Sequence, residues 1–326
     1  MLLSLIPLML AQATASSTAP STAPAATPPT TPYSAQSGPA TAPPPPVSET
    51  LAAHRDDRDR MTVEVGIGDK GPFRFLIDTG AQTTVISTGL ARRLGLPPMA
   101  RHSVLGIAGR MEVDTVELPE IRLGRRTYSD YTTPLLDDEN VGADGIIGID
   151  GLQGQRVLLD FHNQKITLAD SSNRSFDNGF EIVVSARRRS GQLIMTNADI
   201  DGISTDVVID TGGEGTIGNR ALQAALARRH TTHATTLVSV TGQTIDADVA
   251  LASQLTVDRL FINNVVIAYA DSPTFAALKL DKRPAVLLGM RELRLFKRVA
   301  IDFQGRRVLF DVSAYSPVNA QLARLR

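Results

Sequence analysis

The chain has 326 residues, of which 42% are hydrophobic, and its formal net charge is −1. This length and composition can bury a sizeable core, as two units more readily than as one. A net charge near zero excludes a strong overall field toward nucleic acid or an acidic membrane surface, and the absence of cysteine excludes disulfides, zinc–thiolate sites and thiol nucleophiles.

The start of the chain has the pattern of a signal peptide. Residues 1–13 form a short apolar run that ends in Ala-Gln-Ala, the small-x-small pattern of a signal-peptidase site. The run is too short to span a bilayer easily, so we expect no stable membrane span. We therefore predict that the protein is exported. A short buried strand is the alternative interpretation.

Residues 14–59 are predicted to be a disordered linker. Ala, Thr, Ser and Pro dominate residues 14–47, which contain ten of the nineteen prolines. Such a segment buries too little apolar surface to offset its ordering entropy, so it is interpreted as a tether or as a Pro-rich ligand for a partner domain. Residues 51–60 are rich in both charges and are predicted to be solvated, with His54 at the surface.

The first unit is predicted over residues 60–172 and begins with two strands. Apolar residues alternate with others over 61–68, and a second strand leads from Phe73 to Asp78. A short helix is expected over 88–94. A hairpin is expected over 104–113, with its reversal between two glycines.

The second unit is predicted over residues 180–314 and follows the same order. Strands are expected over 181–186, 192–200 and 204–210, a helix capped by Asn219 over 220–229, and a hairpin over 237–245. The polar residues 171–179 are interpreted as the linker between the units, and residues 315–326 as a C-terminal tail.

One pattern occurs in both units. Three apolar residues lead into Asp-Thr-Gly at Asp78 and again at Asp210, 132 positions later. A single copy is typical of a turn that ends a strand, but two copies in equivalent contexts indicate a duplicated unit. Each copy is followed by apolar-apolar-Gly at Gly148 or Gly289 and by an Asp-Phe hairpin.

These three features resemble the retropepsin-like aspartic proteases, and the bacterial exported members in particular. The resemblance covers residues 60–312. It implies an all-β, bilobal pepsin/retropepsin-like fold with two duplicated β-barrel-like lobes and short helices. Family members act as homodimers or as single chains, so two units here imply a monomer with an intramolecular pseudo-dimer. The resemblance further implies a bacterial periplasmic or secreted protein.

Asp78 and Asp210 are predicted to form a catalytic pair. A carboxylate at the end of a buried strand needs a partner or a proton, and two facing carboxylates share one proton and titrate together. In the aspartic proteases the ionised member takes a proton from water while the protonated member polarises the scissile carbonyl. The resemblance therefore implies an endopeptidase for an extended peptide or protein, with no metal and no cofactor required.

The flanking residues are expected to support this pair. The resemblance implies that Thr79 and Thr211 brace the two loops through their hydroxyls. Gly80 and Gly212 should allow close backbone approach and donate N–H groups to the carboxylates.

Two positions depart from the pattern of the family, which often has Ser two residues after the glycine. Gln82 and Glu214 stand at these positions. Gln82 can donate to an aspartate through its amide. Glu214 either points inward, where it would raise the pKa of the pair, or lies outward in solvent.

The two hairpins are candidate substrate flaps. The reversal of the first is Gly106-Ile107-Ala108-Gly109, and that of the second is Thr241-Gly242. We expect the first to be the closing flap, with Ile107 packed on an apolar peptide that pairs like an added strand. Ordinary surface hairpins are the alternative.

A second functional hypothesis is a weak or inactive bilobal peptide-binding protein of the cell envelope. Intact aspartates in both units argue against it. A serine hydrolase or a metal hydrolase lacks support, and the five histidines form no H-E-x-x-H motif.

Overall fold

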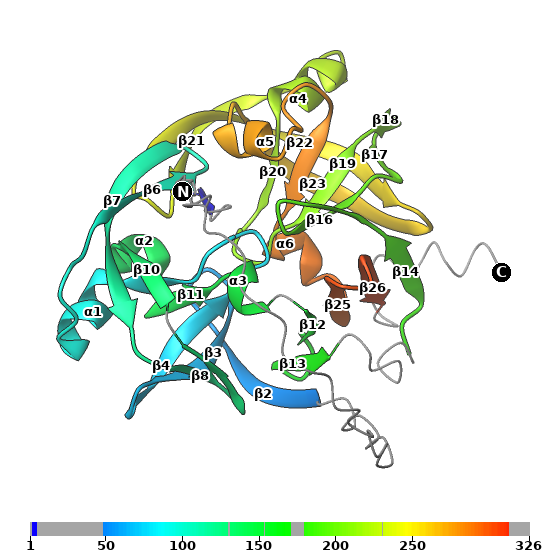
Figure 1. Cartoon of the computed structure of the whole chain (residues 1–326). Coiled ribbons are helices and arrows are strands. Elements are labelled where there is room, and N and C mark those ends of the chain that lie inside the picture. Colours follow the sequence, from blue (N-terminus) through cyan, green and yellow to red (C-terminus); the bar gives the residue numbers. More distant parts are fainter. Residues whose placement is uncertain are drawn as a thin grey trace, which may run out of the picture.

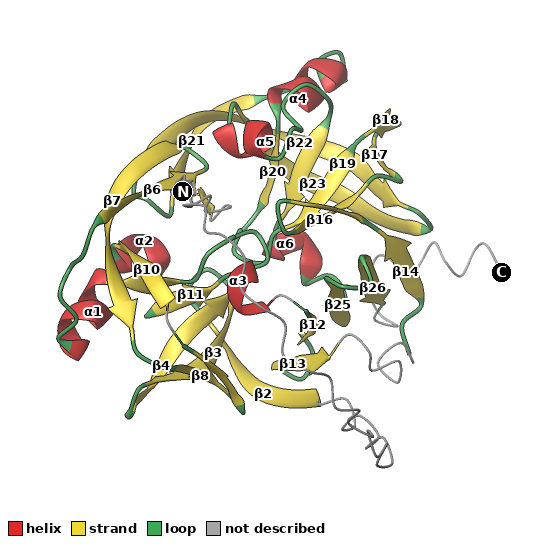
Figure 2. Ribbon diagram, in the orientation of Figure 1, coloured by secondary structure: helices red, strands yellow, loops and turns green. Residues whose placement is uncertain are grey.

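The computed structural model describes residues 2–4, 48–129, 131–152, 154–170, 179–229 and 231–312. Strands dominate these residues, the helices are short, and the chain forms two lobes (Figures 1 and 2). The expectation of an all-β, bilobal fold is therefore confirmed. In the described part of the chain, no helix combines the length and apolar character needed to cross a membrane.

Within the described residues, the first lobe contains twelve strands and three helices. The strands are β2 (Ser48–Arg55), β3 (Met61–Ile67), β4 (Lys70–Ile77), β5 (Val85–Ser87), β6 (Arg101–Gly106), β7 (Gly109–Leu118), β8 (Ile121–Leu123), β9 (Arg126–Tyr128), β10 (Tyr131–Leu136), β11 (Gly145–Ile147), β12 (Gln155–Asp160) and β13 (Lys165–Asp170). The helices are α1 (Thr88–Leu94), α2 (Asp138–Val141) and α3 (Ile149–Leu152).

The second lobe follows a similar order. Its strands are β14 (Ile182–Ser185), β15 (Arg187–Arg189), β16 (Gln192–Met195), β17 (Ala198–Ile200), β18 (Ile203–Ser204), β19 (Asp206–Ile209), β20 (Thr216–Gly218), β21 (His233–Ser239), β22 (Thr244–Val257), β23 (Leu260–Ala270), β24 (Ala285–Leu288), β25 (Arg298–Asp302) and β26 (Arg307–Asp311). Its helices are α4 (Arg220–Leu226), α5 (Pro273–Ala277) and α6 (Met290–Leu293).

The duplication is visible in strand pairing. In the first lobe β4 pairs in parallel with β11, and β5 pairs antiparallel with β11. In the second lobe β19 pairs in parallel with β24, and β20 pairs antiparallel with β24. The short helices α1 and α4 then begin at equivalent N-caps, Ser87 and Asn219, whose side chains accept from backbone N–H groups. The helix expected over 220–229 ends earlier, at Leu226.

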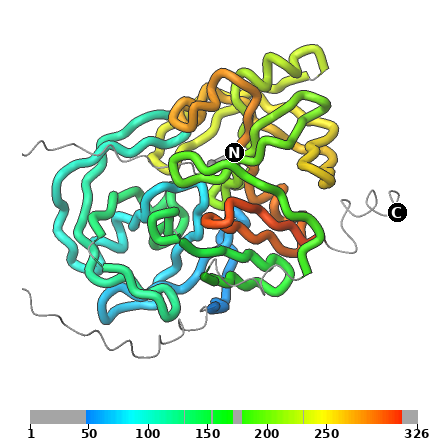
Figure 3. The backbone as a smooth tube through the Cα atoms, turned by 45° about the vertical axis from the view of Figure 1, so that its right-hand side comes forward, coloured from blue at the N-terminus to red at the C-terminus, as the bar shows by residue number. Residues whose placement is uncertain are grey.

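A central sheet joins the two lobes. Its strands run in the order β14-β26-β25-β12-β13-β2, and β12 of the first lobe pairs antiparallel with β25 of the second. Figure 3 shows the red β25–β26 hairpin beside green strands of the first lobe. Val157 and Val299 lie in the same apolar cluster, so the core is continuous across this sheet.

The predicted linker over 14–59 is wrong at its C-terminal end. Ser48–Arg55 forms β2, which pairs with β13 on one side and β3 on the other. Ala53 and Arg60 are buried, so residues 51–60 are not a solvated segment. Backbone hydrogen bonds hold β2 on both of its edges. Such pairing requires no pattern of apolar side chains, so the apolar pattern did not reveal this strand.

Several predicted segments lie outside the described residues. These are the Pro-rich residues 14–47, most of the interlobe linker and the tail over 315–326. Of the predicted signal peptide, Leu2–Ser4 is described as strand β1, which pairs in parallel with β21.

A buried ion pair across the central sheet yields a stability prediction. Arg156 of the first lobe and Asp302 of the second are fully buried, 2.7 Å apart. We expect Asp302→Asn to lower the free energy of unfolding by about 3 kcal/mol, because it removes the carboxylate charge that faces a buried guanidinium. Denaturant titration measures this change.

The matched control is Asp160→Asn. Asp160 stands at the equivalent turn and accepts the Asn163 N–H at 2.8 Å, as Asp302 accepts the Gly305 N–H. This substitution should cost no more than about 1 kcal/mol. Equal losses for the two variants would show that the turn, and not the ion pair, matters.

Candidate active site

The two Asp-Thr-Gly loops meet at the junction of the lobes. Asp78 follows the last residue of β4, and Asp210 follows the last residue of β19. The last residues of both strands are buried against parallel neighbours, so both aspartates are carried into the interior. Asp78 is 0% exposed and Asp210 is 1% exposed.

Each loop folds around its own carboxylate in the same way. Oδ1 of Asp78 accepts N–H groups from Gly80 at 2.7 Å and Ala81 at 3.0 Å. Oδ1 of Asp210 accepts them from Gly212 at 3.1 Å and Gly213 at 2.9 Å. The loops therefore place the two carboxyls by equivalent backbone contacts.

The threonines link the loops to each other, as expected. The Thr79 hydroxyl donates to the Ile209 carbonyl at 3.0 Å, and the Thr211 hydroxyl donates to the Ile77 carbonyl at 2.7 Å. The backbone N–H of each threonine also donates to the hydroxyl of the other. These four bonds are reciprocal, and every one of them joins one half of the chain to the other.

The glycines bring the carboxyls face to face. A Cβ added at Gly80 would lie 2.6 Å from Oδ1 of Asp210, and one at Gly212 would overlap Oδ2 of Asp78. Each glycine therefore packs against the aspartate of the opposite loop, and only a residue without a side chain fits there.

The electrostatics of the site follow from this burial. Burial raises the pKa of Asp78, against the opposing effect of the Gly80 and Ala81 N–H groups. Burial also raises the pKa of Asp210, and the charge of Asp78 raises it further, to well above its ordinary range. Oδ2 of Asp78 lies against the backbone of Gly212, whose N–H group lowers the pKa of Asp78.

Gln82 and Glu214 are not brought to the carboxyls. The Gln82 amide donates to the Ser190 carbonyl at 3.0 Å. The Glu214 side chain lies 4.0 Å from Arg291 and is 28% exposed. The proposed donation from Gln82 to an aspartate is therefore wrong, and Glu214 faces outward.

Two further residues, which were not predicted from the sequence, contact the carbonyl groups of the loops. Arg60 donates to the Gly212 carbonyl at 3.5 Å, and Gln192 donates to the Gly80 carbonyl at 2.6 Å. Both residues are 1% exposed. They stand 132 positions apart, the spacing of the two aspartates, and this spacing is the signal that could have revealed them.

A second set of equivalent contacts holds the far ends of the loops. The Thr84 hydroxyl donates to Asp150 at 2.7 Å, and the Thr216 hydroxyl donates to Glu292 at 2.6 Å. Burial raises the pKa of both acids. They therefore act as acceptors that anchor each loop to the short helix behind it.

The two flap candidates cross between the lobes. Ile107 is fully buried in an apolar cluster whose other buried members all come from the second lobe, among them Leu237 and Phe275. In return, Val240 of the second hairpin is buried in a cluster of first-lobe residues that includes Val104 and Leu76.

The hairpins also contact each other. Gln243 donates to the Arg110 carbonyl at 3.3 Å, and a Cβ added at Gly106 would overlap the Ser239 hydroxyl. Figure 1 shows the β6–β7 hairpin reaching the strands β21 and β22. The structure therefore shows a reciprocal arrangement, in which Ile107 packs in the second lobe and Val240 in the first. Which hairpin closes over a substrate stays a prediction.

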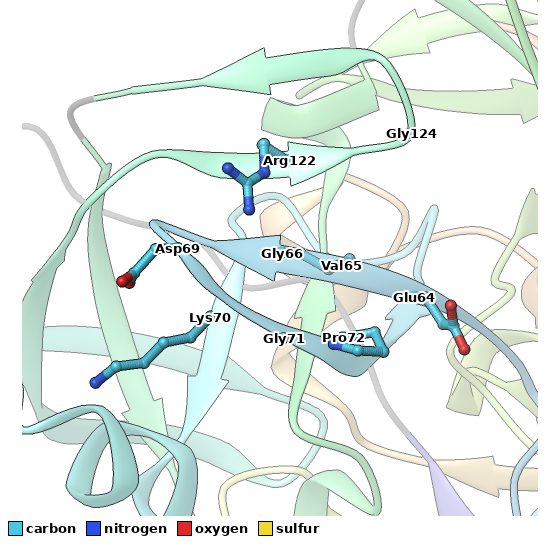
Figure 4. A pocket seen from close by; sticks show the side chains of 9 residues that line it. All are labelled: Glu64, Val65, Gly66, Asp69, Lys70, Gly71, Pro72, Arg122 and Gly124. Carbon is cyan, nitrogen blue, oxygen red and sulfur yellow. The ribbon is translucent and has the colours of Figure 1, made fainter.

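A pocket on the outside of the first lobe is not part of this site. It has a volume of about 280 Å³ and is lined by the β3–β4 hairpin and β8, with Arg122 pointing toward the hairpin (Figure 4). None of its lining residues is a candidate site residue. In the described ranges, no group of three or more His, Cys, Asp or Glu side chains is placed to hold a metal ion.

Comparison with known proteins supports the assignment of both halves. A family model described as aspartyl protease matches residues 63–150 and again residues 196–291, together more than half of the chain. The chain therefore belongs to the aspartyl protease family and contains two retropepsin-like units, as its motifs indicated. Each match contains one Asp-Thr-Gly loop. No curated protein matches the chain.

The crossed hairpins yield a prediction about their dynamics. Ile107→Ala and Val240→Ala should each speed amide hydrogen exchange in both hairpins, because each removes a buried contact with the opposite lobe. Met111→Ala is the control, since this side chain is exposed on the same hairpin. Faster exchange for Ile107→Ala alone would favour the first hairpin as the single closing flap.

Proposed function

We propose that the chain is an aspartic endopeptidase that hydrolyses peptide bonds with a water activated between Asp78 and Asp210. One observation carries this proposal. Two buried carboxyls with raised pKa values come from equivalent loops, and each packs on the glycine of the other loop. Pairs of this kind hold one proton between them and serve as acid and base together.

The mechanism uses the two carboxyls in opposite states. One carboxylate accepts a proton from the water. The oxygen of that water attacks the scissile carbonyl carbon at the same time. The protonated partner donates a hydrogen bond to the carbonyl oxygen and stabilises the developing charge. The proton taken from the water then passes to the leaving nitrogen as the carbon–nitrogen bond breaks. The pair thereby returns to its singly protonated state.

The proposed substrate is an extended peptide or protein. It would lie beneath the two hairpins and pair with their backbone like an added strand. Entry requires the hairpins to separate, because Ile107 and Val240 are buried in opposite lobes. The aliphatic clusters that these tips occupy favour a substrate with apolar side chains near the scissile bond.

We further propose that the protein is exported and acts as a monomer. Export rests on the apolar N-terminal run and the Ala-Gln-Ala sequence that follows it. Monomeric action rests on the presence of both aspartates in one chain. Light scattering and activity across a dilution series test it, since activity that vanished with dimer dissociation would require an intermolecular site.

The proposed function predicts the effect of neutralising either aspartate. Asp78→Asn and Asp210→Asn should each lower kcat/KM for a cleavable peptide by about 100-fold or more, because the one remaining carboxyl cannot act as base and as acid at the same time. The Tm at pH 7 should not fall, since burial makes ionisation of these carboxyls costly and Asn carries no charge.

The measurement is cleavage of a diverse peptide mixture by the purified chain, followed by mass spectrometry, with and without pepstatin. Gln82→Asn is the matched control, because its side chain contacts Ser190 and not the carboxyls. A single Asp→Asn variant that kept near wild-type turnover would disprove the shared pair. Binding of peptides without cleavage by the wild type would favour the peptide-binding alternative.

A further inference from the structure

The two halves of the site differ in charge at one equivalent position. Arg60 directly precedes β3 and donates to the carbonyl of Gly212 at 3.5 Å, while Gln192 begins β16 and donates to the carbonyl of Gly80 at 2.6 Å. Each side chain thus crosses to the loop of the opposite half. One is a cation and the other is a neutral amide, so the duplication has diverged at a contact within the site.

Arg60 is held rigidly in the interior. Its guanidinium donates to Asp56 at 2.7 Å through Nε and to the Val141 carbonyl at 2.7 Å through Nη2. The Asp56 carboxylate is itself buried and also accepts the N–H groups of Arg58 and Arg60. A buried guanidinium with these partners cannot swing into solvent, so its charge stays beside the loops.

The charged groups around Arg60 come from several elements. Asp56 and Arg58 lie on the β2–β3 turn, Asp78 follows β4, and Asp210 follows β19. Glu214 acts on Arg58 from the second loop. Asp56 therefore neutralises part of the Arg60 charge, and the remainder acts on the two aspartates.

We propose that Arg60 is a positioning residue of the proposed protease site, which braces the second Asp-Thr-Gly loop and supplies a positive charge that the equivalent Gln192 lacks. This inference rests on the proposed function. Arg60 touches neither carboxyl in the hydrogen bonds described, so it acts on the reaction through the ionisation of the pair and through the Gly212 backbone.

The Arg60 charge affects the ionisation of both aspartates in the same direction. The Arg60 charge lowers the pKa of both Asp78 and Asp210, against the larger raising effect of burial. Removal of this cation favours the protonated carboxyls. Both ionisation steps of the pair should then move to higher pH, and both limbs of the bell-shaped profile of kcat/KM should follow.

The experiment compares four variants of the full chain with the wild type. Arg60→Gln gives both halves the same residue, and Arg60→Lys keeps the charge. Gln192→Met removes the equivalent brace without changing any charge. Asp56→Asn keeps the acceptor oxygen for the backbone N–H groups but removes the negative charge that neutralises Arg60.

Two readouts are used for each variant. The first is a ¹³C NMR titration of the aspartate carboxyls, with the pair assigned from Asp78→Asn and Asp210→Asn. The second is the pH profile of kcat/KM on one cleavable peptide. Arg60→Gln should move both steps up by about 0.5 to 1 pH unit, Asp56→Asn should move them down, and Arg60→Lys and Gln192→Met should leave them in place.

The outcomes separate this inference from the proposed function. A folded Arg60→Gln variant that titrates like the wild type would overturn the inference, and so would an equal shift in Gln192→Met. If Arg60→Gln does not fold, Asp56→Asn decides, and the absence of a downward shift would overturn it. A wild type that cleaves no peptide refutes the proposed function, whereas the NMR titration still tests the role of Arg60.

Discussion

Two carboxyl groups are buried against each other, and the rest of the site makes this costly arrangement stable. Each carboxyl loses its hydration, so it needs donors from the protein or a proton. Each loop supplies two backbone N–H groups to its own aspartate, while the opposite loop supplies a glycine that allows contact. The crossed hydroxyls of Thr79 and Thr211 then hold the loops together. No single half of the chain could form these contacts.

The two halves are therefore joined by other contacts besides those of the site. Strands β12 and β25 of the two halves pair within one continuous sheet. Ile107 and Val240 of the two hairpins are each buried in the opposite lobe. A sheet held by backbone hydrogen bonds and an apolar core resists opening, whereas two hairpin tips are a smaller contact. The hairpins are thus the part of the molecule expected to move when a peptide enters.

Local patterns that recur at a fixed spacing were predictable from the sequence. The strands that carry Asp78 and Asp210, the helix over 88–94 and both hairpins belong to this class. Strand β2 was not predictable, because Ala53 is the one buried residue among its eight and backbone pairing holds it. The burial of Val240 in the opposite lobe was not predictable either, because this is a single apolar residue beside a polar reversal. Arg60 and Gln192 differ in type, so only their common spacing relates them.

Mixing two inactive chains tests the central claim most directly, namely that one chain supplies both aspartates of the pair. Asp78→Asn and Asp210→Asn chains would be purified separately, unfolded together, refolded as a mixture and assayed on a cleavable peptide beside identically treated wild type. The account predicts that the mixture stays as inactive as either variant alone, because each folded molecule pairs its own two loops. Activity approaching a quarter to a half of wild type would show that loops from different chains pair, and it would contradict the account.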